Sequence, residues 1–237
     1  MGFKPNVRRN IKIEKNLFEQ IKCAFHSPPS LSNQLVGIRN IYHGSFGKRT
    51  AILPSIKNNG AISLESQLEL GHAIELERLS SIYAYRTQAI KIELGNNSHA
   101  FPDFLILNNL KQYELHEVKE CLDSLSDEQI EKFNQIKKYL KKLDIEYKLL
   151  DHRHIPTLRQ RQRLLAMYQS IRTHQLSDER IELAKEIPFP KCMPLEHLYS
   201  YFENYDYSYE DLNYLLFYKH IGKNNVREIN ILEKFNG

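Results

Sequence analysis

The clearest hydrophobic pattern in the chain lies between residues 101 and 120, FPDFLILNNLKQYELHEVKE. A run of four apolar residues follows Asp103 and is short enough for a buried strand, and the Asn108-Asn109 pair favours a turn. A second strand is predicted from Tyr113 to Lys119. The pattern therefore predicts two strands joined as a hairpin.

This hairpin also brings together the residue types of a metal site. Side chains alternate between the faces of a strand, so Glu117 and Lys119 are expected on one face, with Asp103 at the start of the partner strand. Carboxylates are hard oxygen ligands for a divalent cation, which activates water and stabilises charge on a phosphate. A lysine beside them can stabilise the transition state. The alternative is a salt bridge at a sheet edge, without chemistry.

Helical periodicity precedes and follows the hairpin. Apolar residues recur at helical spacing after Ser63, which we expect to cap a glutamate-bearing helix. Glu65 and Glu69 are four residues apart and share a face, so one can bind a metal while the other faces solvent. A second capped helix is predicted from Ser126, and residues 145–150 form the pattern of a last strand.

The remaining segments complete an element order. Residues 82–94 alternate like a strand, and Gly95 begins a hairpin signal. Residues 1–16 are expected to be irregular, residues 17–25 to form a short helix and residues 26–60 to be loop. Helix, three strands, helix and strand is typical of an α/β core in which helices cover a mixed sheet.

Beyond residue 156 the pattern is helical. The predicted helices are 157–174, one capped by Ser177, 194–202 and 209–220. A short closing strand at 230–235 would make this a small winged-helix-like domain. The tyrosines between residues 199 and 209 suit stacking on bases, a protein interface or an aromatic core.

Charge is unevenly distributed along the 237 residues, whose formal net charge is +4. Residues 1–60 hold ten Lys/Arg against two acidic residues, residues 61–155 hold twelve against sixteen, and residues 156–237 hold eleven of each. We therefore expect a basic N-terminal arm and loop (1–60), a core (61–155) and a C-terminal domain (156–237). A basic arm beside a metal-seeking core suits DNA, because Lys/Arg contacts release counterions from phosphates. The alternative is a solvated basic tail.

Candidate DNA contacts lie in the segment before the core. Arg39, Lys48, Arg49 and Lys57 interleave with aromatic residues, which suits contacts to phosphate and sugar. The three cysteines have no ligand spacing, which argues against a disulfide frame or a zinc site. With no apolar signal core and no long apolar run, we expect a soluble protein of the bacterial cytoplasm, associated with the nucleoid and not with a membrane.

A family resemblance sharpens these expectations. Pro102-Asp103 followed by Glu117-Val118-Lys119 spells the PD…(D/E)xK pattern and resembles the nuclease superfamily that includes type II restriction enzymes. Residues 53–92, with a serine-lysine segment, a glutamate helix and a tyrosine–glutamine strand, are similar to the corresponding part of TnsA-type endonucleases. The resemblance covers roughly residues 45–155.

The resemblance implies a restriction-endonuclease-like core and a role in cut-and-paste DNA transposition. TnsA-type proteins cut the 5′, non-transferred strand at transposon ends, while a DDE-type transposase cuts the other strand and an AAA+ ATPase regulates the assembly. In that family the catalytic glutamate lies nineteen residues before the strand glutamine, which here selects Glu69 before Gln88 over Glu65.

The same resemblance implies which residues of this chain bind the metal ion and which act in catalysis. The implied metal ligands are Glu69, Asp103, Glu117 and the Val118 carbonyl, the catalytic lysine is Lys119, and Gln88 joins the candidate DNA contacts. The implied cation is Mg²⁺, with Mn²⁺ as a substitute. Two other readings stay open: a stand-alone restriction or junction-resolving nuclease, and a catalytically inactive DNA-binding assembly scaffold.

Overall fold

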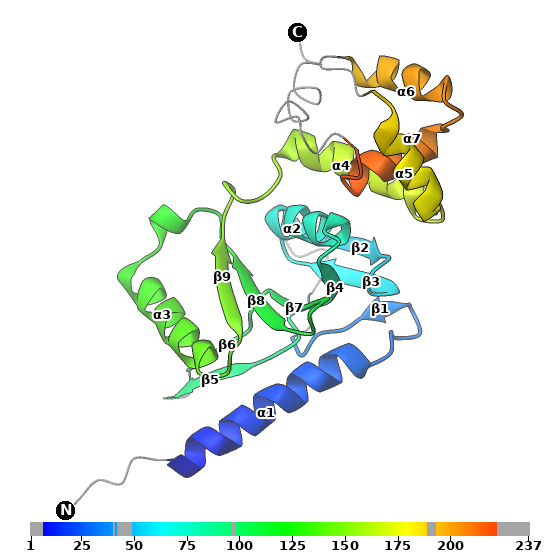
Figure 1. Ribbon diagram of the computed structural model, residues 1–237. Helices are drawn as coiled ribbons and strands as arrows, with labels where there is room; N and C mark the ends of the chain where they lie inside the picture. The colour runs from blue at the N-terminus through cyan, green and yellow to red at the C-terminus, as the bar shows by residue number, and fades with distance from the viewer. Residues whose placement is uncertain (1–6, 40, 42–48, 96–97, 189–192, 222–237) are drawn as a thin grey trace, which may run out of the picture. The chain divides into compact units, whose positions relative to one another are not determined.

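The computed structural model describes residues 7–39, 41, 49–95, 98–188 and 193–221, and forms two compact units (Figure 1). The N-terminal unit contains the chain up to Glu77 together with Ser81–Ile155, and the C-terminal unit contains Arg78–Ser80 together with the chain from Pro156. Helices and mixed sheets make this an α/β protein, as the sequence predicts. Among the described residues, no helix combines the length and apolar character needed to cross a bilayer.

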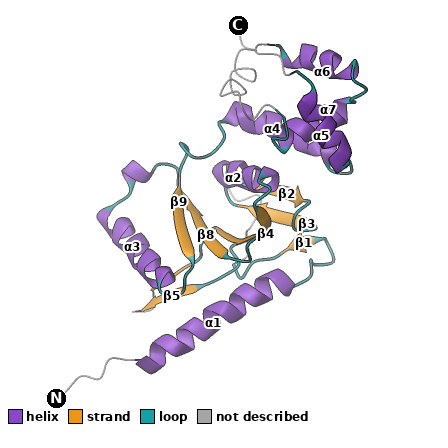
Figure 2. Ribbon diagram, viewed as in Figure 1, coloured by secondary structure: helices purple, strands orange, loops and turns teal. Residues whose placement is uncertain are grey.

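A four-stranded mixed sheet of order β4-β7-β8-β9 is the centre of the N-terminal unit (Figure 2). The strands β4 (Ile82–Thr87), β7 (Phe104–Asn108) and β8 (Tyr113–Val118) are antiparallel neighbours, and β9 (Glu146–Leu150) pairs in parallel with β8. The predicted hairpin is confirmed.

The hairpin turn is built from the residues that the sequence singles out for it. Asn108 Oδ1 accepts hydrogen bonds from the Leu110 and Gln112 N–H groups at 2.9 and 3.0 Å, and Lys111 adopts a φ of 63°. An asparagine side chain that bonds to nearby backbone groups in this way favours a tight turn. The turn sets the register that places Phe104 opposite His116.

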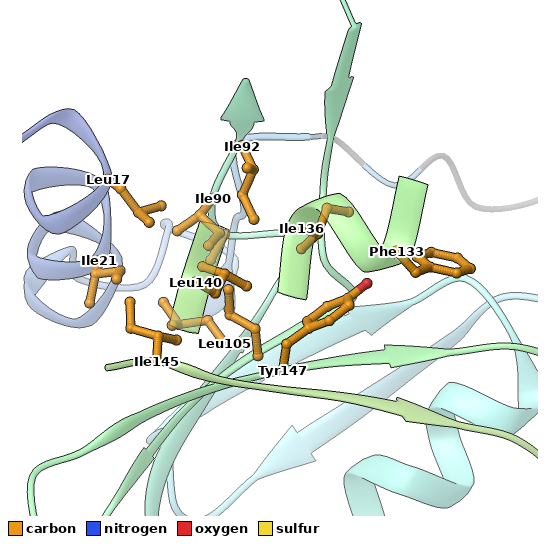
Figure 3. Packing of buried hydrophobic residues seen from close by; sticks show 12 residues of the cluster. Leu17, Ile21, Ile90, Ile92, Leu105, Phe133, Ile136, Leu140, Ile145 and Tyr147 are labelled. Atoms are coloured by element: carbon orange, nitrogen blue, oxygen red, sulfur yellow. The ribbon is translucent and has the colours of Figure 1, made fainter. Parts of the chain in front are cut away.

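Helices cover both faces of this sheet. Helix α1 (Val7–His26) and helix α3 (Asp127–Lys141) pack on one face, and helix α2 (Gln67–Arg78) contacts the other through His72 against Phe104. The first face carries the main hydrophobic cluster (Figure 3), whose members include Leu17, Ile21, Leu105, Leu115, Phe133, Ile136, Leu140 and Tyr147. Burial of this cluster is the main force that holds the unit together.

The helix starts follow capping chemistry, but one differs from the prediction. Ser126 and Gln129 form the predicted capping box of α3. Helix α2 begins at Gln67, and its first turn is capped by Ser66, whose Oγ accepts from the Glu69 N–H at 3.0 Å. The prediction that Ser63 caps this helix is wrong. Ser63 lies in β3 (Gly60–Leu64), where it pairs with Ile52 of β2 (Ala51–Ser55).

The segment expected to be an arm and loop is instead part of the fold. Helix α1 starts at Val7, so the prediction that residues up to 16 are irregular is wrong for the described part. The apolar residues Val7, Ile11, Phe18, Ile21 and Phe25 recur at helical spacing, so the amphipathic pattern already begins at Val7. Three strands form a second sheet of order β1-β3-β2: β1 (Gln34–Leu35), β2 (Ala51–Ser55) and β3 (Gly60–Leu64).

A two-stranded ribbon and a short helical turn complete this unit. Residues 82–94 are not one strand, because the chain leaves the sheet after β4 and then forms β5 (Ile92–Gly95), which pairs with β6 (Ser98–Ala100). A 3₁₀ turn, η1 (Leu122–Ser124), follows β8.

The C-terminal unit is helical in its described part. It contains α4 (Leu158–Ile171), α5 (Asp178–Glu186), α6 (Leu195–Glu203) and α7 (Tyr209–Phe217). The Ser177 cap is confirmed. Tyr207 is buried in the core of the unit, whereas Tyr205 and Tyr209 are exposed, so the tyrosines divide between core and surface. The expected strand at 230–235 lies outside the described residues.

Candidate active site

Asp103 is held firmly at the start of the hairpin. It lies directly before β7 and is 8% exposed. Its Oδ2 accepts a hydrogen bond from the Val118 N–H at 2.8 Å, and its Oδ1 accepts one from Gln88 Nε2 at 2.9 Å. Because each carboxylate oxygen has two lone pairs, the oriented group retains the capacity to bind a cation. Val118, whose carbonyl is the predicted backbone ligand, is the last residue of β8.

Glu117 and Lys119 contact each other at the end of β8. Lys119 Nζ donates to Glu117 Oε1 at 2.6 Å, which confirms that the two side chains share a side of the strand. Burial lowers the pKa of Lys119, but the negative charges of Glu117 and Asp103 more than offset this, so the pKa is raised overall. The lysine is therefore a fixed positive charge beside the carboxylates.

Glu69 joins the group from the first turn of α2. It is 6% exposed, and its Oε2 accepts from the Glu65 N–H at 2.8 Å. Burial first and then the negative charge of Asp103 raise the pKa of Glu69 to about 7. The Glu69 carboxyl is thus within electrostatic reach of Asp103. Glu65 is not on the helix, because it precedes Gln67, and it forms an ion pair with Arg39.

Three carboxyl groups thus crowd around one lysine. Burial and the charge of Asp103 raise the pKa of Glu117 to about 7, and burial raises the pKa of Asp103 against the opposing effect of Lys119. The four side chains Glu69, Asp103, Glu117 and Lys119 are named the carboxylate cluster below. The three carboxylates repel one another when all are ionised, and a bound cation would offset that repulsion.

The cluster fits a hard divalent cation. Its donors are carboxylate oxygens supplied by α2, by the start of β7 and by the end of β8. Mg²⁺ and Mn²⁺ prefer carboxylate oxygen and water, while thiolate and imidazole favour softer ions. Glu69, Asp103 and Glu117 are the residues that would hold the ion.

The free energy of unfolding should depend on the protonation of Glu69 and Glu117. The pKa values of Glu69 and Glu117 are raised from 4.5 to about 7, so the folded chain keeps protons that the unfolded chain has lost. Their combined contribution to the free energy of unfolding should fall as pH rises from about 4.5 to 7 and level off above 7. Urea unfolding without divalent cations, measured between pH 5 and 8, checks this.

The matched control is the double variant Glu69→Gln/Glu117→Gln, which should flatten the decline. Glu114, whose pKa is lowered to about 2, acts in the opposite sense only below about pH 4.5 and so lies outside the measured window. His72, whose lowered pKa makes stability rise with pH up to about 6.5, is present in both proteins, so its effect cancels in their comparison. A wild-type stability that does not fall relative to the double variant between pH 5 and 7 would contradict the assigned pKa shifts.

The candidate DNA contacts have different environments. Arg39 is partly exposed, and its guanidinium pairs with Glu65 and lies 5.9 Å from the centre of the Phe101 ring. Arg49 is exposed. Lys48 lies outside the described residues.

Two of these candidates are engaged inside the fold. Lys57 Nζ donates to the Ile82 carbonyl at 2.7 Å, and burial lowers the pKa of Lys57 to about 8. Gln88 is 1% exposed and bonds to Asp103. Lys57 is only partly buried, so its contact with DNA stays a prediction, whereas the burial of Gln88 disfavours a contact with DNA.

A buried histidine pair beside the cluster was not anticipated. His72 Nε2 lies 2.9 Å from His116 Nδ1, and His116 Nε2 lies 3.2 Å from Glu114 Oε2. Burial keeps the pKa of His72 well below its usual value. The pair ties α2 to β8 on the face opposite Glu117, and thereby helps to hold Glu69 near the hairpin. The alternation of side chains along a strand is the signal that could have found part of it, because it places His116 on the opposite face from Glu117.

A second group of potential ligands lies after β8 and β9. One ligand atom each from Cys121, Asp151 and His152 lie within 4.8 Å of one another. Asp151 is fully buried, and its oxygens already accept hydrogen bonds from Arg153 and from the Leu122 N–H at 3.1 Å. Because hydrogen bonds already use the Asp151 oxygens, we interpret these three residues as a link between the ends of β8 and β9.

The sequence was compared with known protein families and with curated proteins. No protein-family model matches the chain, and no curated protein is significantly similar to it in sequence.

Proposed function

We propose that this protein is a metal-dependent DNA endonuclease of the PD-(D/E)xK class with a restriction-endonuclease-like core. The observation that carries the proposal is the carboxylate cluster, in which the buried Glu69 and Asp103, the partly buried Glu117 and one lysine converge at the open end of a hairpin. Titratable groups with strongly perturbed pKa values often mark functional sites. A salt bridge without chemistry would explain Glu117 and Lys119, but not two further buried acids beside them.

The cation, Asp103 and Lys119 would have different roles in phosphodiester hydrolysis. When bound, the cation supplies Lewis acidity and lowers the pKa of a water molecule. Asp103 is kept oriented by two hydrogen-bond donors, so it is ready to bind without rearrangement. Lys119 places its ammonium group beside Glu117, where it would stabilise the negative charge that builds on the scissile phosphate.

The finer proposal is a TnsA-like subunit of a heteromeric transposase that cuts the 5′ strand at transposon ends. It is supported by the spacing of Glu69, Gln88, Asp103 and the Glu117-Val118-Lys119 triplet. The C-terminal unit, proposed as winged-helix-like, would dock on a DDE-type transposase and an AAA+ ATPase. Action on DNA would place the protein at the nucleoid.

Two other functions compete with this one. A stand-alone restriction or junction-resolving nuclease would use the same cluster without partners. An inactive DNA-binding scaffold would have no need of the complete cluster. The full-length chain with Mg²⁺ should leave plasmid DNA intact alone and nick duplex transposon ends when transposase and ATPase are added. Vigorous cutting by the chain alone would favour the stand-alone nuclease.

The choice between the two glutamates gives a second prediction and a direct test of the site. Glu69→Gln should reduce nicking about a hundredfold or more, because it removes a carboxylate ligand. Glu65→Gln should retain nicking, because Glu65 binds Arg39 outside the helix. Nicking of an end-labelled transposon-end duplex, with transposase and ATPase present, measures both rates. The two substitutions are chemically identical, so each serves as the other's control. Activity lost in Glu65→Gln and kept in Glu69→Gln would refute the assignment.

A further inference from the structure

Gln88 is the most constrained residue beside the carboxylate cluster. It follows β4, is 1% exposed and has a φ of 49°, in the left-handed region that residues other than glycine rarely adopt. Its N–H donates to the Asp103 carbonyl at 3.1 Å, and its carbonyl accepts from the Ile38 N–H at 2.9 Å. Backbone strain that the surroundings hold in place is concentrated at functional sites.

The loop that contains Gly37 packs tightly against the backbone of Gln88. A Cβ added to Gly37 would lie 2.5 Å from the carbonyl oxygens of both Thr87 and Gln88, a distance that side chains do not tolerate. Glycine at this position lets the loop approach the backbone closely. Gln88 is therefore fixed both from the loop and from the sheet.

The side-chain amide of Gln88 is satisfied at one end only. Nε2 donates to Asp103 Oδ1 at 2.9 Å, which turns the NH₂ group toward the carboxylate and the oxygen away from it. Oε1 is buried and accepts no hydrogen bond from the part of the chain that the structure describes. Gln20 shows the usual arrangement, because its oxygen accepts from the Lys91 N–H at 2.8 Å and its nitrogen donates to the Lys91 carbonyl at 3.3 Å.

A buried acceptor without a protein donor requires one from elsewhere. The neighbouring group is Asp103, which attracts cations. A hydrated divalent cation meets both requirements, because the carboxylates hold the ion and its water molecules donate hydrogen bonds. Mg²⁺ in particular keeps several waters when it binds to protein carboxylates.

We infer that Gln88 is a positioning residue for the hydrated cation of the carboxylate cluster. Its Nε2 orients Asp103, and its Oε1 accepts a hydrogen bond from a water molecule bound to the cation. The inference rests on the proposed function, because it requires a cation at Asp103. It gives Gln88 a role that its burial permits, in place of contact with DNA.

The test measures Mn²⁺ binding to the full-length chain by titration calorimetry, without DNA. Gln88→Met keeps the side-chain length without a hydrogen-bonding group, and Gln88→Asn shortens the amide in a residue type that tolerates left-handed backbone. Both should weaken Mn²⁺ binding about ten- to hundredfold, the usual effect of losing a group that supports metal ligands. Gln20→Met, which loses an amide bonded elsewhere, should bind Mn²⁺ like the wild type.

A measurement on the unsubstituted chain covers the case in which the variants do not fold. On addition of Mg²⁺, the side-chain NH₂ resonance of Gln88 should shift in ¹⁵N–¹H spectra, while that of Gln20 stays in place. Unchanged Mn²⁺ affinity in a folded Gln88 variant, or an unmoved Gln88 resonance when Mg²⁺ is bound, would overturn the inference and leave the proposed function standing. If the wild type binds no Mn²⁺, or Asp103→Asn binds it equally well, the proposed function itself fails.

Discussion

Replacing Asp103 by Asn is expected to abolish strand cleavage, with a loss of at least about a hundredfold. Asp103 is the one acid of the cluster that both neighbouring strands hold, through the Val118 N–H at 2.8 Å and through Gln88 Nε2 at 2.9 Å. Asn would keep the size of the side chain but would lose the negative charge and one acceptor atom. Nicking of a labelled transposon-end duplex with transposase and ATPase present, and Mn²⁺ titration of the chain alone, measure the two consequences.

The matched control for this substitution is Asp144→Asn. Asp144 is exposed, lies in the turn before β9 and has a φ of 56°, a conformation that Asn also accepts. It should cleave DNA and bind Mn²⁺ like the wild type. Full nicking by Asp103→Asn, with Mn²⁺ affinity unchanged, would show that the chemistry lies elsewhere.

Lys119→Met should lower the nicking rate about a hundred- to thousandfold while Mn²⁺ binding persists. The reason is that the ammonium acts on charge in the transition state and does not bind the ion, so its loss changes the rate and not the metal affinity. Lys119 Nζ lies 5.8 Å from the centre of the Phe133 ring. Met removes this ammonium group and retains the apolar stem of the side chain. Single-turnover cleavage and calorimetry separate the two effects.

Lys148→Met provides a close control. Lys148 Nζ pairs with Glu114 Oε2 at 2.6 Å, the same distance as from Lys119 Nζ to Glu117 Oε1, on the same sheet but outside the cluster. It should leave cleavage unchanged. Equal loss of activity in both variants would mean that lysine–glutamate pairing supports the sheet, and that Lys119 has no special role.

The hairpin and the grouping of its polar side chains were predictable because they depend on short-range rules. Alternation along a strand places Glu117 and Lys119 together, and an asparagine turn fixes the register. The choice of Glu69 over Glu65 came from family spacing and not from physics, and the structure places Glu69 on the helix and near Asp103.

Other features depend on tertiary contacts that a single sequence does not display. Ser63 lies in a strand because β2 and β3 pair. The burial of Gln88 depends on the close approach of Gly37, and that of His72 depends on His116. In each case a partner distant along the chain determines the environment.

The different origins of the cluster residues also bear on how the site forms during folding. Asp103, Glu117 and Lys119 belong to one hairpin, whose contacts are local in sequence, whereas Glu69 arrives on α2 from beyond β4. Local contacts tend to form before distant ones. The hairpin would thus present two acids and the lysine first, and the docking of α2 would bring the third acid against them. Electrostatic repulsion then opposes the last step of assembly, and protons or divalent cations should accelerate it.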